Sequence, residues 1–379
     1  MPSVYGVIGV LIDLEVFKKY QKKQKAEIGY QKISKESQIR HSNTEMIINK
    51  METSNYSLVV HNIHKTYEIG KNETVKALKG VSFFVKKGEI FGLLGPNGAG
   101  KTSLLGILTG HLLQNRGEAF IGGLHINKNK KEIYKMIGVC PQFDCLWPEL
   151  TVEDHFLFYI RLRGANRKME KFYLKETISH MKLEEHRKKR VSELSGGMKR
   201  RVSIGIAIAG KTKLVFLDEP TSGLDPINRI QIWHILNELR GKRSIVLTTH
   251  LMDEADQLCD RIGIINFGKI ICLDHQSNLK NRFGDGFIFY VIFEENREIN
   301  FDEFMMFMLS FDEKTKIVSR EKKSLSLRFT IDKIKLIGFF EKLKANKERL
   351  GVYSWNFAQS SLKDIFIKAV EESEKKLAN

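Results

Sequence analysis

The apolar residues of this chain form short runs separated by turn residues and by stretches of helical spacing. Four of these runs are predicted strands, namely Leu58–Val60, Val81–Val85, Leu214–Leu217 and Ser244–Leu247. The last two are nearly continuous apolar runs, which are typical of parallel strands buried on both faces. Residues 26–55, by contrast, are polar and show no sustained periodicity, so we predict a linker there.

A helical pattern lies between the second and third of these strands. Thr151 and Asp154 have the spacing of a capping box, in which two side chains close the first turn of a helix. Apolar residues then cluster in Phe156–Ile160. We predict that a basic helical stretch continues from there to about Arg190.

The pattern changes near Gly284-Asp285-Gly286, which suggests a domain boundary. Beyond it the sequence predicts the order β-α-β-β-α-β, at Phe287–Phe293, Asp302–Phe311, Ile317–Val318, Leu325–Phe329, Ile334–Leu343 and Val352–Phe357. This order fits a small ferredoxin-like α+β domain. A last amphipathic helix, with Leu362, Ile365, Phe366 and Ala369 on one face, is predicted to dock on that domain.

Composition places the chain among folded globular proteins. Its 379 residues allow two or three domains, and 42% of them are hydrophobic and 28% charged. The formal net charge of +17 has two interpretations, a basic face for nucleic acid or an anionic membrane, or scattered solvated lysines. The four cysteines, Cys140, Cys145, Cys259 and Cys272, contain no C-x-x-C pair. We therefore expect thiols in a reducing cytosol, with neither zinc nor disulfides.

The first 25 residues carry a possible membrane signal. No apolar run approaches the ~18 residues that suggest a span, and Val4–Ile12 as a helix would cover roughly 13 Å of a ~30 Å hydrocarbon core. This run lacks the basic n-region and the clean cleavage site of a signal peptide. The lysine-rich block Lys18–Lys25 follows it, which by the positive-inside rule predicts the cytosolic end of a membrane helix. The alternative is a disordered leader.

One loop has the spacing G-x-x-x-x-G-K-[ST] between a predicted strand, Glu89–Leu94, and a helical pattern that begins at Leu104. Its residues are Gly95, Pro96, Asn97, Gly98, Ala99, Gly100, Lys101, Thr102 and Ser103. The glycines let the backbone wrap a phosphate, and the helix N-terminus directs its free N–H groups at that anion. Lys101 adds a charge for the β- and γ-phosphates, and the Thr102 hydroxyl suits Mg²⁺. The flanking strand and helix make a chance glycine-rich turn the weaker interpretation, so we expect nucleoside triphosphate binding.

Two carboxylates follow a predicted buried strand. Asp218 and Glu219 end the run Leu214–Leu217. In this position Asp218 would lie near Mg²⁺, and Glu219 would face the water that attacks the γ-phosphate. Acidic residues often end strands, so the signal gains its weight from the phosphate loop in the same chain.

A second device for anions precedes a basic helix. Ser195, Gly196 and Gly197 stand where a helix N-terminus is predicted, and that helix carries Lys199–Arg201. Taken alone, the segment also fits a simple N-cap with a flexible hinge.

Three further residues are weak signals alone and support nucleotide binding only together with the motifs above. His250 follows a predicted strand, where an imidazole would contact a γ-phosphate, although a lone histidine is usually structural. Gln142 follows the predicted strand Ile137–Val139, and its amide suits Mg²⁺ and water. The ring of Tyr67 would stack on adenine, although core packing is the better interpretation of an isolated tyrosine.

Together these residues resemble the nucleotide-binding domain of an ABC transporter, with the family's motifs in the family's order over about Leu58 to Leu279. Tyr67 matches the A-loop, Gly95–Ser103 the Walker A motif, Gln142 the Q-loop, Leu194–Met198 the signature, Leu214–Glu219 the Walker B motif, Ser222–Asp225 the D-loop and His250 the switch histidine. Gly223 stands where many members carry alanine, a minor departure. Three strings, Cys140–Asp144, Leu279–Gly286 and Ser361–Ile367, are similar to the A subfamily.

The resemblance implies an ATPase that uses ATP and Mg²⁺ and powers lipid transport from the cytosolic side of a membrane. It implies a catalytic set of Glu219, His250, Gln142 and Lys101, with Thr102, Gln142 and Asp218 as Mg²⁺ ligands. It further implies a head-to-tail dimer of two such domains, in which the signature closes over the partner's ATP, together with transmembrane domains that this sequence does not contain. No nucleic acid is expected as a partner.

Two other functions compete with transport. A soluble ABC ATPase that acts on nucleic acid or ribosomes would suit the positive charge, but such proteins usually carry two cassettes or a long coiled coil, and neither occurs here. A non-hydrolytic nucleotide sensor is the third possibility, against which Glu219 and His250 are both present.

We accordingly predict an α/β P-loop ATPase with three parts. Residues 1–55 form the end of a membrane helix and a basic linker. Residues 56–284 form the nucleotide-binding domain, with a helical subdomain at about 146–205. Residues 285–379 form a ferredoxin-like regulatory domain, which is the place that the A subfamily reserves for one.

Overall fold

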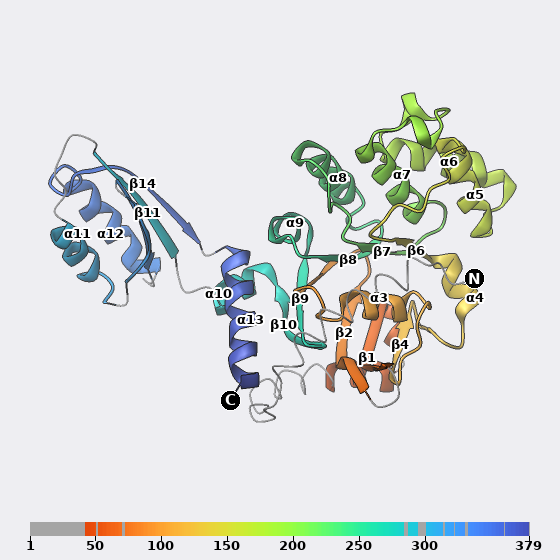
Figure 1. Cartoon of the computed structure of the whole chain (residues 1–379), viewed down its shortest axis with the longest axis horizontal. Helices are drawn as coiled ribbons and strands as arrows, with labels where there is room; N and C mark the ends of the chain where they lie inside the picture. The colour runs from red at the N-terminus through yellow and green to blue at the C-terminus, as the bar shows by residue number, and fades with distance from the viewer. Residues whose placement is uncertain are drawn as a thin grey trace. The chain divides into compact units, whose positions relative to one another are not determined.

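A computed structural model describes residues 42–50, 52–69, 73–283, 287–294, 301–313, 315–321, 323–329, 333–359 and 361–378. Its contacts divide the chain into two compact units (Figure 1). The first comprises the described residues up to His275 together with those from Val370 onward, and the second comprises Gln276–Ala369. The predicted membrane-helix end at 1–25 and the predicted boundary at 284–286 lie outside the described residues.

Part of the predicted linker is instead ordered structure. Residues 42–49 form a helix, and a 3₁₀ turn, η1 (Glu52–Asn55), follows it. Thr44 and Ile47 of this helix are buried. The Thr44 hydroxyl lies 2.8 Å from Nδ1 of His61. Two buried side chains in a largely polar helix leave too little periodicity to identify it from sequence.

The first unit is built around a six-stranded sheet. Its strand order is β10 (Lys269–His275), β9 (Arg261–Asn266), β3 (Ile90–Leu94), β8 (Ser244–Thr249), β7 (Leu214–Asp218) and β6 (Ile137–Cys140). All neighbouring strands are parallel except β10, which pairs antiparallel with β9. Every residue of β3 and β8 is buried, as the continuous apolar runs predict for central parallel strands.

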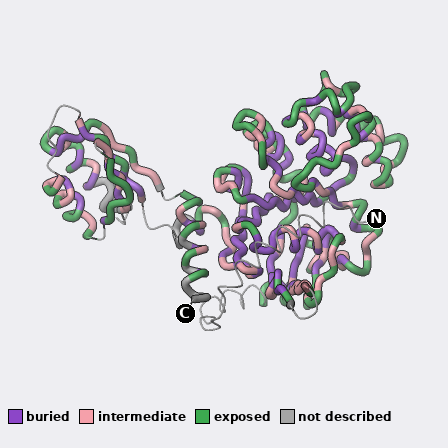
Figure 2. The backbone as a smooth tube through the Cα atoms, in the orientation of Figure 1, coloured by how far each residue is buried: buried purple, intermediate pink, exposed green. Residues whose placement is uncertain are grey.

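A second, antiparallel sheet belongs to the same unit. Its order is β2 (Glu73–Lys86), β1 (Tyr56–Ile69), β4 (Arg116–Ile121) and β5 (Leu124–His125). Helix α3 (Lys101–Leu108) contacts both β2 and β7, so it bridges the two sheets. The buried residues of α3 and of both sheets form one apolar core, in which the rings of Phe83 and Phe91 stack with centroids 5.0 Å apart. This core, purple in Figure 2, fixes the start of α3 against the sheets.

The segment between β6 and β7 is helical, as predicted. It contains α5 (Val152–Leu162), α6 (Arg167–His180), the 3₁₀ turns η2 (Glu184–His186) and η3 (Val191–Glu193), and α7 (Gly196–Ile208). α5, α6 and α7 pack together (Figure 1). The capping box is confirmed, because the amide of Asp154 donates to Oγ1 of Thr151 at 3.1 Å and the reciprocal bond is present.

The predicted extension of this helical stretch to Arg190 is wrong. Helix α5 ends at Leu162, where Gly164 takes a φ of 74° that favours glycine, and α6 ends at His180. The chain then turns back so that Arg190 pairs with Thr151 in an isolated β-bridge. The predicted helical stretch therefore consists of two separate α-helices, and beyond His180 the chain has only short 3₁₀ turns as it returns toward Thr151.

Two glycines let helix α7 approach its neighbours closely. A Cβ on Gly138 of β6 would lie 1.7 Å from the carbonyl oxygen of Ala207. A Cβ on Gly205 would lie 2.6 Å from the ring of Phe156 in α5. The helix that begins at Ser195-Gly196-Gly197 is thus packed against both β6 and α5.

The remaining helices of the first unit are α4 (Lys130–Met136), α8 (Pro226–Glu238) and α9 (Met252–Leu258). The second unit begins with α10 (Gln276–Phe283) and continues with β11 (Phe287–Phe293), α11 (Phe301–Leu309), β12 (Lys316–Arg320), β13 (Ser324–Phe329), α12 (Lys333–Ala345) and β14 (Val352–Gln359). The β-α-β-β-α-β order is the one that the sequence predicts. The four strands form an antiparallel sheet in the order β12-β13-β11-β14 over an aromatic-rich core.

Helix α13 (Leu362–Ala378) follows β14, and the division into units falls within it. Leu362, Ile365 and Ala369, which the sequence places on its apolar face, are buried. In the described part of the chain, no helix combines the length and the apolar character needed to cross a bilayer.

Candidate active site

The predicted phosphate loop joins β3 to α3, and its shape depends on glycine. Gly98 and Gly100 have φ values of 78° and 105°, in the left-handed region that other residues rarely adopt. A Cβ on Gly95 would lie 2.4 Å from the carbonyl oxygen of Ile265, and one on Gly100 would lie 2.7 Å from that of Ala77. The loop is therefore pressed against two neighbouring strands in a form that only glycine allows.

The Lys101 side chain lies inside the curve of this loop. Its Nζ donates to the carbonyl oxygens of Gly95 at 2.7 Å and Pro96 at 3.1 Å, and the residue is only 6% exposed. No side chain caps the start of α3 at Gly100, and the N-terminus of a helix directs its backbone N–H groups toward an anion. Loop, ammonium and helix start together provide the positive cradle that a polyphosphate requires.

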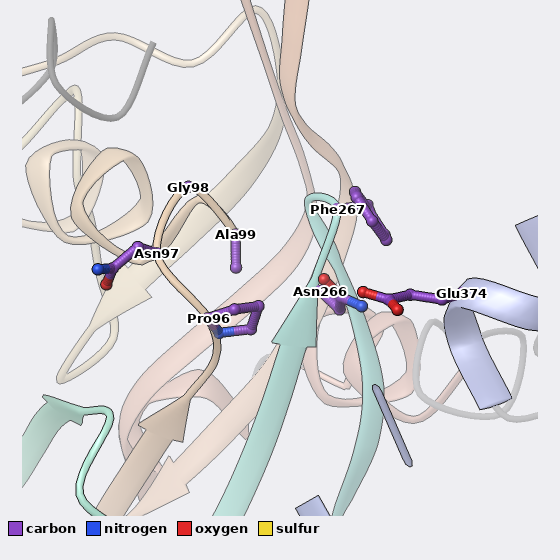
Figure 3. A pocket seen from close by; sticks show the side chains of 7 residues that line it. All are labelled: Pro96, Asn97, Gly98, Ala99, Asn266, Phe267 and Glu374. Carbon is purple, nitrogen blue, oxygen red and sulfur yellow. The ribbon is translucent and has the colours of Figure 1, made fainter. Parts of the chain in front are cut away.

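The turn between β9 and β10 also contacts the phosphate loop. The amide of Gly268 donates to the carbonyl oxygen of Ala99 at 3.0 Å. Pro96, Asn97, Gly98 and Ala99 line a pocket with Asn266, Phe267 and Glu374 (Figure 3). Asn266 is 3% exposed, and its Nδ2 has no hydrogen-bond partner among the described residues.

Tyr67 lies beside the phosphate loop. Its hydroxyl donates to Oγ of Ser103 at 3.1 Å, and Nζ of Lys65 lies 5.0 Å from the centre of its ring. The residue is half-buried on β1 rather than enclosed in the core. This places an aromatic ring next to the predicted nucleotide position.

The second predicted feature, the pair of carboxylates, stands at the carboxyl end of β7. The Thr248 hydroxyl of the neighbouring strand β8 donates to Oδ1 of Asp218. Glu219 takes a φ of 45°, which is unusual for a residue with a side chain, and its amide donates to both the carbonyl oxygen and Oγ1 of Thr248 at 3.1 Å. Thr248 thus fixes both acidic residues.

Gln142 and His250 meet at the Glu219 carboxylate, although they lie far from it in sequence. Nε2 of Gln142 donates to Oε2 of Glu219 at 3.1 Å. Nδ1 of His250 lies 3.2 Å from Oε1 of the same residue. The carboxylate is 12% exposed and His250 46% exposed, so the group lies at the surface and is open to a ligand. The structure therefore brings together three of the four predicted catalytic residues.

Strand pairing relates this carboxylate cluster (Gln142, Asp218, Glu219 and His250) to the phosphate loop. Strand β8 lies between β3 and β7, with Leu94 paired to Thr249 and Asp218 paired to Thr248. Both the phosphate loop and the carboxylate cluster consequently begin at the same edge of the sheet, which is where ligands bind in open α/β sheets.

The predicted Mg²⁺ donors suit that ion. Asp218 offers a carboxylate, Thr102 a hydroxyl and Gln142 an amide oxygen, which are the hard oxygen ligands that Mg²⁺ prefers. Among the described residues, no cluster of three or more His, Cys, Asp or Glu side chains is arranged to hold a metal. A magnesium site here would depend on this mixed set of oxygens and on the phosphates themselves.

The signature residues lie elsewhere in the first unit, at the start of α7. Ser195 is the N-cap, and its Oγ accepts from the amide of Met198 at 3.3 Å. A Cβ on Gly197 would lie 2.3 Å from Oδ1 of Asn228 in α8, whereas a Cβ on Gly196 would have no described atom within 4 Å. The signature therefore meets α8, the helix that follows the predicted D-loop.

Sequence reasoning missed two buried charged residues near the cluster. Arg200, on α7, is 4% exposed and hydrogen-bonded to the loops after β6 and β7. Glu254, on α9, is 1% exposed, and its Oε1 accepts from the Thr221 hydroxyl at 2.7 Å. Burial raises the pKa of the Glu254 carboxyl, although its hydrogen bonds oppose this effect. Helical spacing from the buried residue Ile204 would have placed Arg200 on the inner face of α7, but its charge suggested solvent.

Comparisons with known proteins agree with this geometry. The profile of the ABC transporter family matches residues 78–222. ABC transporter A family member 7 of Dictyostelium discoideum is 39% identical over 312 residues, which are 82% of this chain and 37% of that protein. ABC transporter A family member 9 of Arabidopsis thaliana is 38% identical over 334 residues, 84% of this chain and 35% of that protein. The chain thus spans about a third of the length of these relatives.

Solved structures similar to this chain are ATP-binding cassettes. One is a dimeric cassette in a post-hydrolysis state with ADP and phosphate bound, 26% identical with a TM-score of 0.52, covering 57% of this chain and 98% of its own. Another is a nucleotide-free cassette from an ABC transporter, 28% identical with a TM-score of 0.52, covering 60% and 94% respectively.

Proposed function

We propose that this chain is an ATPase cassette of the ABC transporter family and that it hydrolyses ATP to drive the movement of lipid-like substrates across a membrane. The observation that carries the proposal is the Glu219 carboxylate. Gln142 and His250 hold its two oxygens, and it stands at the sheet edge where the phosphate loop begins.

In this proposal Glu219 is the general base. Its carboxylate accepts a proton from the water that attacks the γ-phosphate. His250 contacts the γ-phosphate and orients Glu219, and Gln142 orients the water. Lys101 and the amides of the phosphate loop hold the β- and γ-phosphates. When bound, Mg²⁺ would neutralise charge on these phosphates, with Thr102, Gln142 and Asp218 as its protein ligands.

Tyr67 completes the nucleotide site by stacking on adenine. Its ring is half-buried and its hydroxyl is fixed to Ser103, so the ring is held beside the phosphate loop. Pro96, Asn97, Ala99 and the loop glycines supply shape and amides rather than reactive groups.

The signature would act on the nucleotide of a second cassette. Ser195, Gly196 and Gly197 lie at the N-terminus of a 13-residue helix, and a Cβ on Gly196 would meet no described atom within 4 Å. One similar cassette is dimeric with ADP and phosphate bound. We propose the same head-to-tail pairing here, with a second copy or with a different cassette, so that ATP stabilises the closed pair and hydrolysis releases it.

The membrane domains would attach next to Gln142. Phe143, Trp147 and Phe158 are 63%, 43% and 46% exposed, and Trp147 contacts the ring of Phe158. Exposed aromatic side chains are typical of protein interfaces. A cytosolic segment of the transmembrane domains bound here would be displaced by any movement of Gln142. The second unit would serve regulation, as its place after an A-subfamily cassette implies.

The test is nucleotide-dependent pairing of the Glu219→Gln variant, which retains the hydrogen-bonding shape of the side chain but not the base. With Mg²⁺ and ATP, sedimentation velocity should show a dimer with itself or with the second cassette of its transporter, and the dimer should dissociate when ATP is removed. The matched control is Glu219→Gln combined with Lys101→Ala, which should remain monomeric. A monomer at high protein and ATP concentration with every candidate partner would contradict the proposed pairing.

A further inference from the structure

A single buried guanidinium joins the loop that carries Gln142 to the turn that carries Glu219. Arg200 is the fifth residue of α7, two residues beyond the signature, and it is 4% exposed. Its hydrogen bonds reach the carbonyl oxygens of Pro141 at 2.8 Å, Gln142 at 3.2 Å, Asp218 at 3.1 Å, Glu219 at 3.1 Å and Pro220 at 2.7 Å, and Oδ1 of Asp144 at 3.0 Å. Three acceptors belong to each loop.

This division follows the planar shape of the side chain. The Nη1 group of Arg200 donates to the segment Pro141–Asp144, whereas Nε and Nη2 donate to Asp218–Pro220. A guanidinium presents its five N–H donors in a fixed fork, so the distance between the two loops is set by one rigid group. A lysine ammonium is a point charge without this geometry.

The Glu219 turn needs such support. A residue with a side chain at a φ of 45° is strained, and the strain persists only where neighbours hold the backbone. Thr248 holds the amide of Glu219, and Arg200 holds its carbonyl oxygen. Removing Arg200 would release one side of this turn and free the segment after β6 at the same time.

We propose that Arg200 is a positioning residue that transmits the nucleotide state of the Glu219 turn to the Gln142 segment. A movement of the carboxylate turn displaces the Arg200 guanidinium, which displaces Pro141–Asp144 and the aromatic surface beside them. Because α7 begins with the signature, the same side chain also ties both loops to the helix that meets a second cassette. This inference rests on the proposed ATPase function for its nucleotide signal, but not for the contacts themselves.

The chain contains its own reporter for the test. Cys145 is exposed and follows Asp144 directly, whereas Cys140, Cys259 and Cys272 are buried. Burial also raises the pKa of the Cys140 thiol to about 12, which keeps it unreactive. The reaction rate of Cys145 with a thiol reagent therefore reports the position of the Gln142 segment in the otherwise native full chain, and Cys145→Ser supplies the background rate.

The variants are Arg200→Lys, Arg200→Met and Asp144→Asn, with Arg201→Met as the matched control. Arg201 is the next residue of α7, and its Nη1 donates to the carbonyl oxygens of Met181 and Lys182, far from both loops in sequence. Thermal unfolding of each variant establishes that it is folded. Asp144→Asn removes only the ion pair to Arg200 and leaves α7 intact, so the test does not depend on the buried substitutions.

Without nucleotide, Cys145 should react several-fold faster in Arg200→Met than in the unaltered chain or in Arg201→Met. Mg²⁺ and ATP should change the rate in the unaltered chain and in Arg201→Met, but not in Arg200→Met. ATP affinity should stay within about twofold, while kcat falls about 10²-fold, as expected when a reacting group is misplaced by an ångström. Arg200→Lys should fail to restore the response, and Asp144→Asn should weaken it.

Equal Cys145 rates and equal ATP responses in the folded Arg200 variants and in Arg201→Met would overturn the inference. So would an unaltered chain that binds ATP without any change at Cys145. An unaltered chain that binds no ATP would instead contradict the proposed function, and the rates without nucleotide would still decide whether Arg200 positions the Gln142 segment.

Discussion

The phosphate loop and the carboxylate cluster stand at the same edge of one sheet, but they are built in different ways. The loop is local, and its shape comes from backbone, with Gly98 and Gly100 at positive φ and Gly95 in contact with a neighbouring strand. The cluster is assembled from three loops that follow β6, β7 and β8, and side chains hold it together. A consecutive motif thus shapes the phosphate loop, whereas the carboxylate cluster depends on long-range contacts.

This difference separates two properties of the proposed ATPase. In the proposed mechanism, the loop contributes charge and amides that act on bound phosphate before and during the reaction, so its variants should change affinity. The cluster would contribute a base and its orientation, which matter only as the water attacks, so its variants should change turnover.

The largest effect is expected for Glu219→Gln. Loss of the general base should lower kcat by about 10²- to 10⁴-fold, while the dissociation constant for ATP stays nearly unchanged. Phosphate release under single-turnover conditions, together with equilibrium binding of ATP, measures the two quantities separately. Turnover near that of the unaltered chain would show that the water is activated by a different group.

A smaller change, in the affinity for ATP rather than in kcat, is expected for Lys101→Ala. Removing the ammonium should weaken ATP binding by roughly 10- to 100-fold, as expected for the loss of one charge-assisted contact. Lys199→Ala on the basic start of α7 serves as the charge-matched control, because it lies outside the phosphate loop. If Lys101→Ala lowered kcat alone and left ATP affinity intact, the separation between loop and cluster would be wrong.

The smallest effect is expected for Glu254, and it concerns the free energy of unfolding rather than ATP binding or turnover. The pKa of the Glu254 carboxyl is raised by burial, so the folded state binds its proton more tightly than the unfolded chain does. The stability that this proton gives is fully present below the unfolded-state pKa of about 4.3 and is lost as pH rises through the folded-state pKa. Each tenfold difference in proton affinity corresponds to about 1.4 kcal/mol.

Glu254→Gln retains an acceptor for the Thr221 hydroxyl but does not titrate. Its free energy of unfolding, relative to that of the unaltered chain, should therefore increase as pH rises from 4.5 to 8, which urea unfolding at several pH values measures. Asp253→Asn, an exposed residue of the same helix, should show no such trend. A constant difference between Glu254→Gln and the unaltered chain across this range would contradict a carboxyl that titrates in the folded state.

The contrast between loop and cluster also explains what the sequence could and could not predict. Gly95–Thr102 is a consecutive pattern whose flanking strand and helix are visible in the same window, so its place in the fold followed directly. Gln142, Glu219 and His250 are separated by long segments, and their meeting was expected only from the resemblance to a family. Strand order then explains the meeting, because the strands before all three residues are neighbours in one parallel sheet.

The predictions that failed depend on tertiary contacts. Nothing local says that the helical stretch ends at His180, because its return is fixed by the pairing of Arg190 with Thr151. The helix at residues 42–49 is stabilised by a contact between Thr44 and His61 of the next strand. The sequence places Arg200 only in a basic helix, and the fold shows that its acceptors include backbone carbonyls from two other loops.

Gly196 differs from the residues on either side of it, because among the described residues it makes no contact that the fold requires. Its neighbours Ser195 and Gly197 have reasons within the chain, since one caps α7 and the other leaves room for Asn228. At Gly196 the backbone is helical and a Cβ would meet no described atom within 4 Å, so folding is indifferent to the residue there. Stability is a property of one molecule, whereas complementarity exists only between two. The residue at such a position can therefore be selected for its fit to a second protein molecule. If the surface of that molecule changes, this residue can change with it without lowering the stability of the fold.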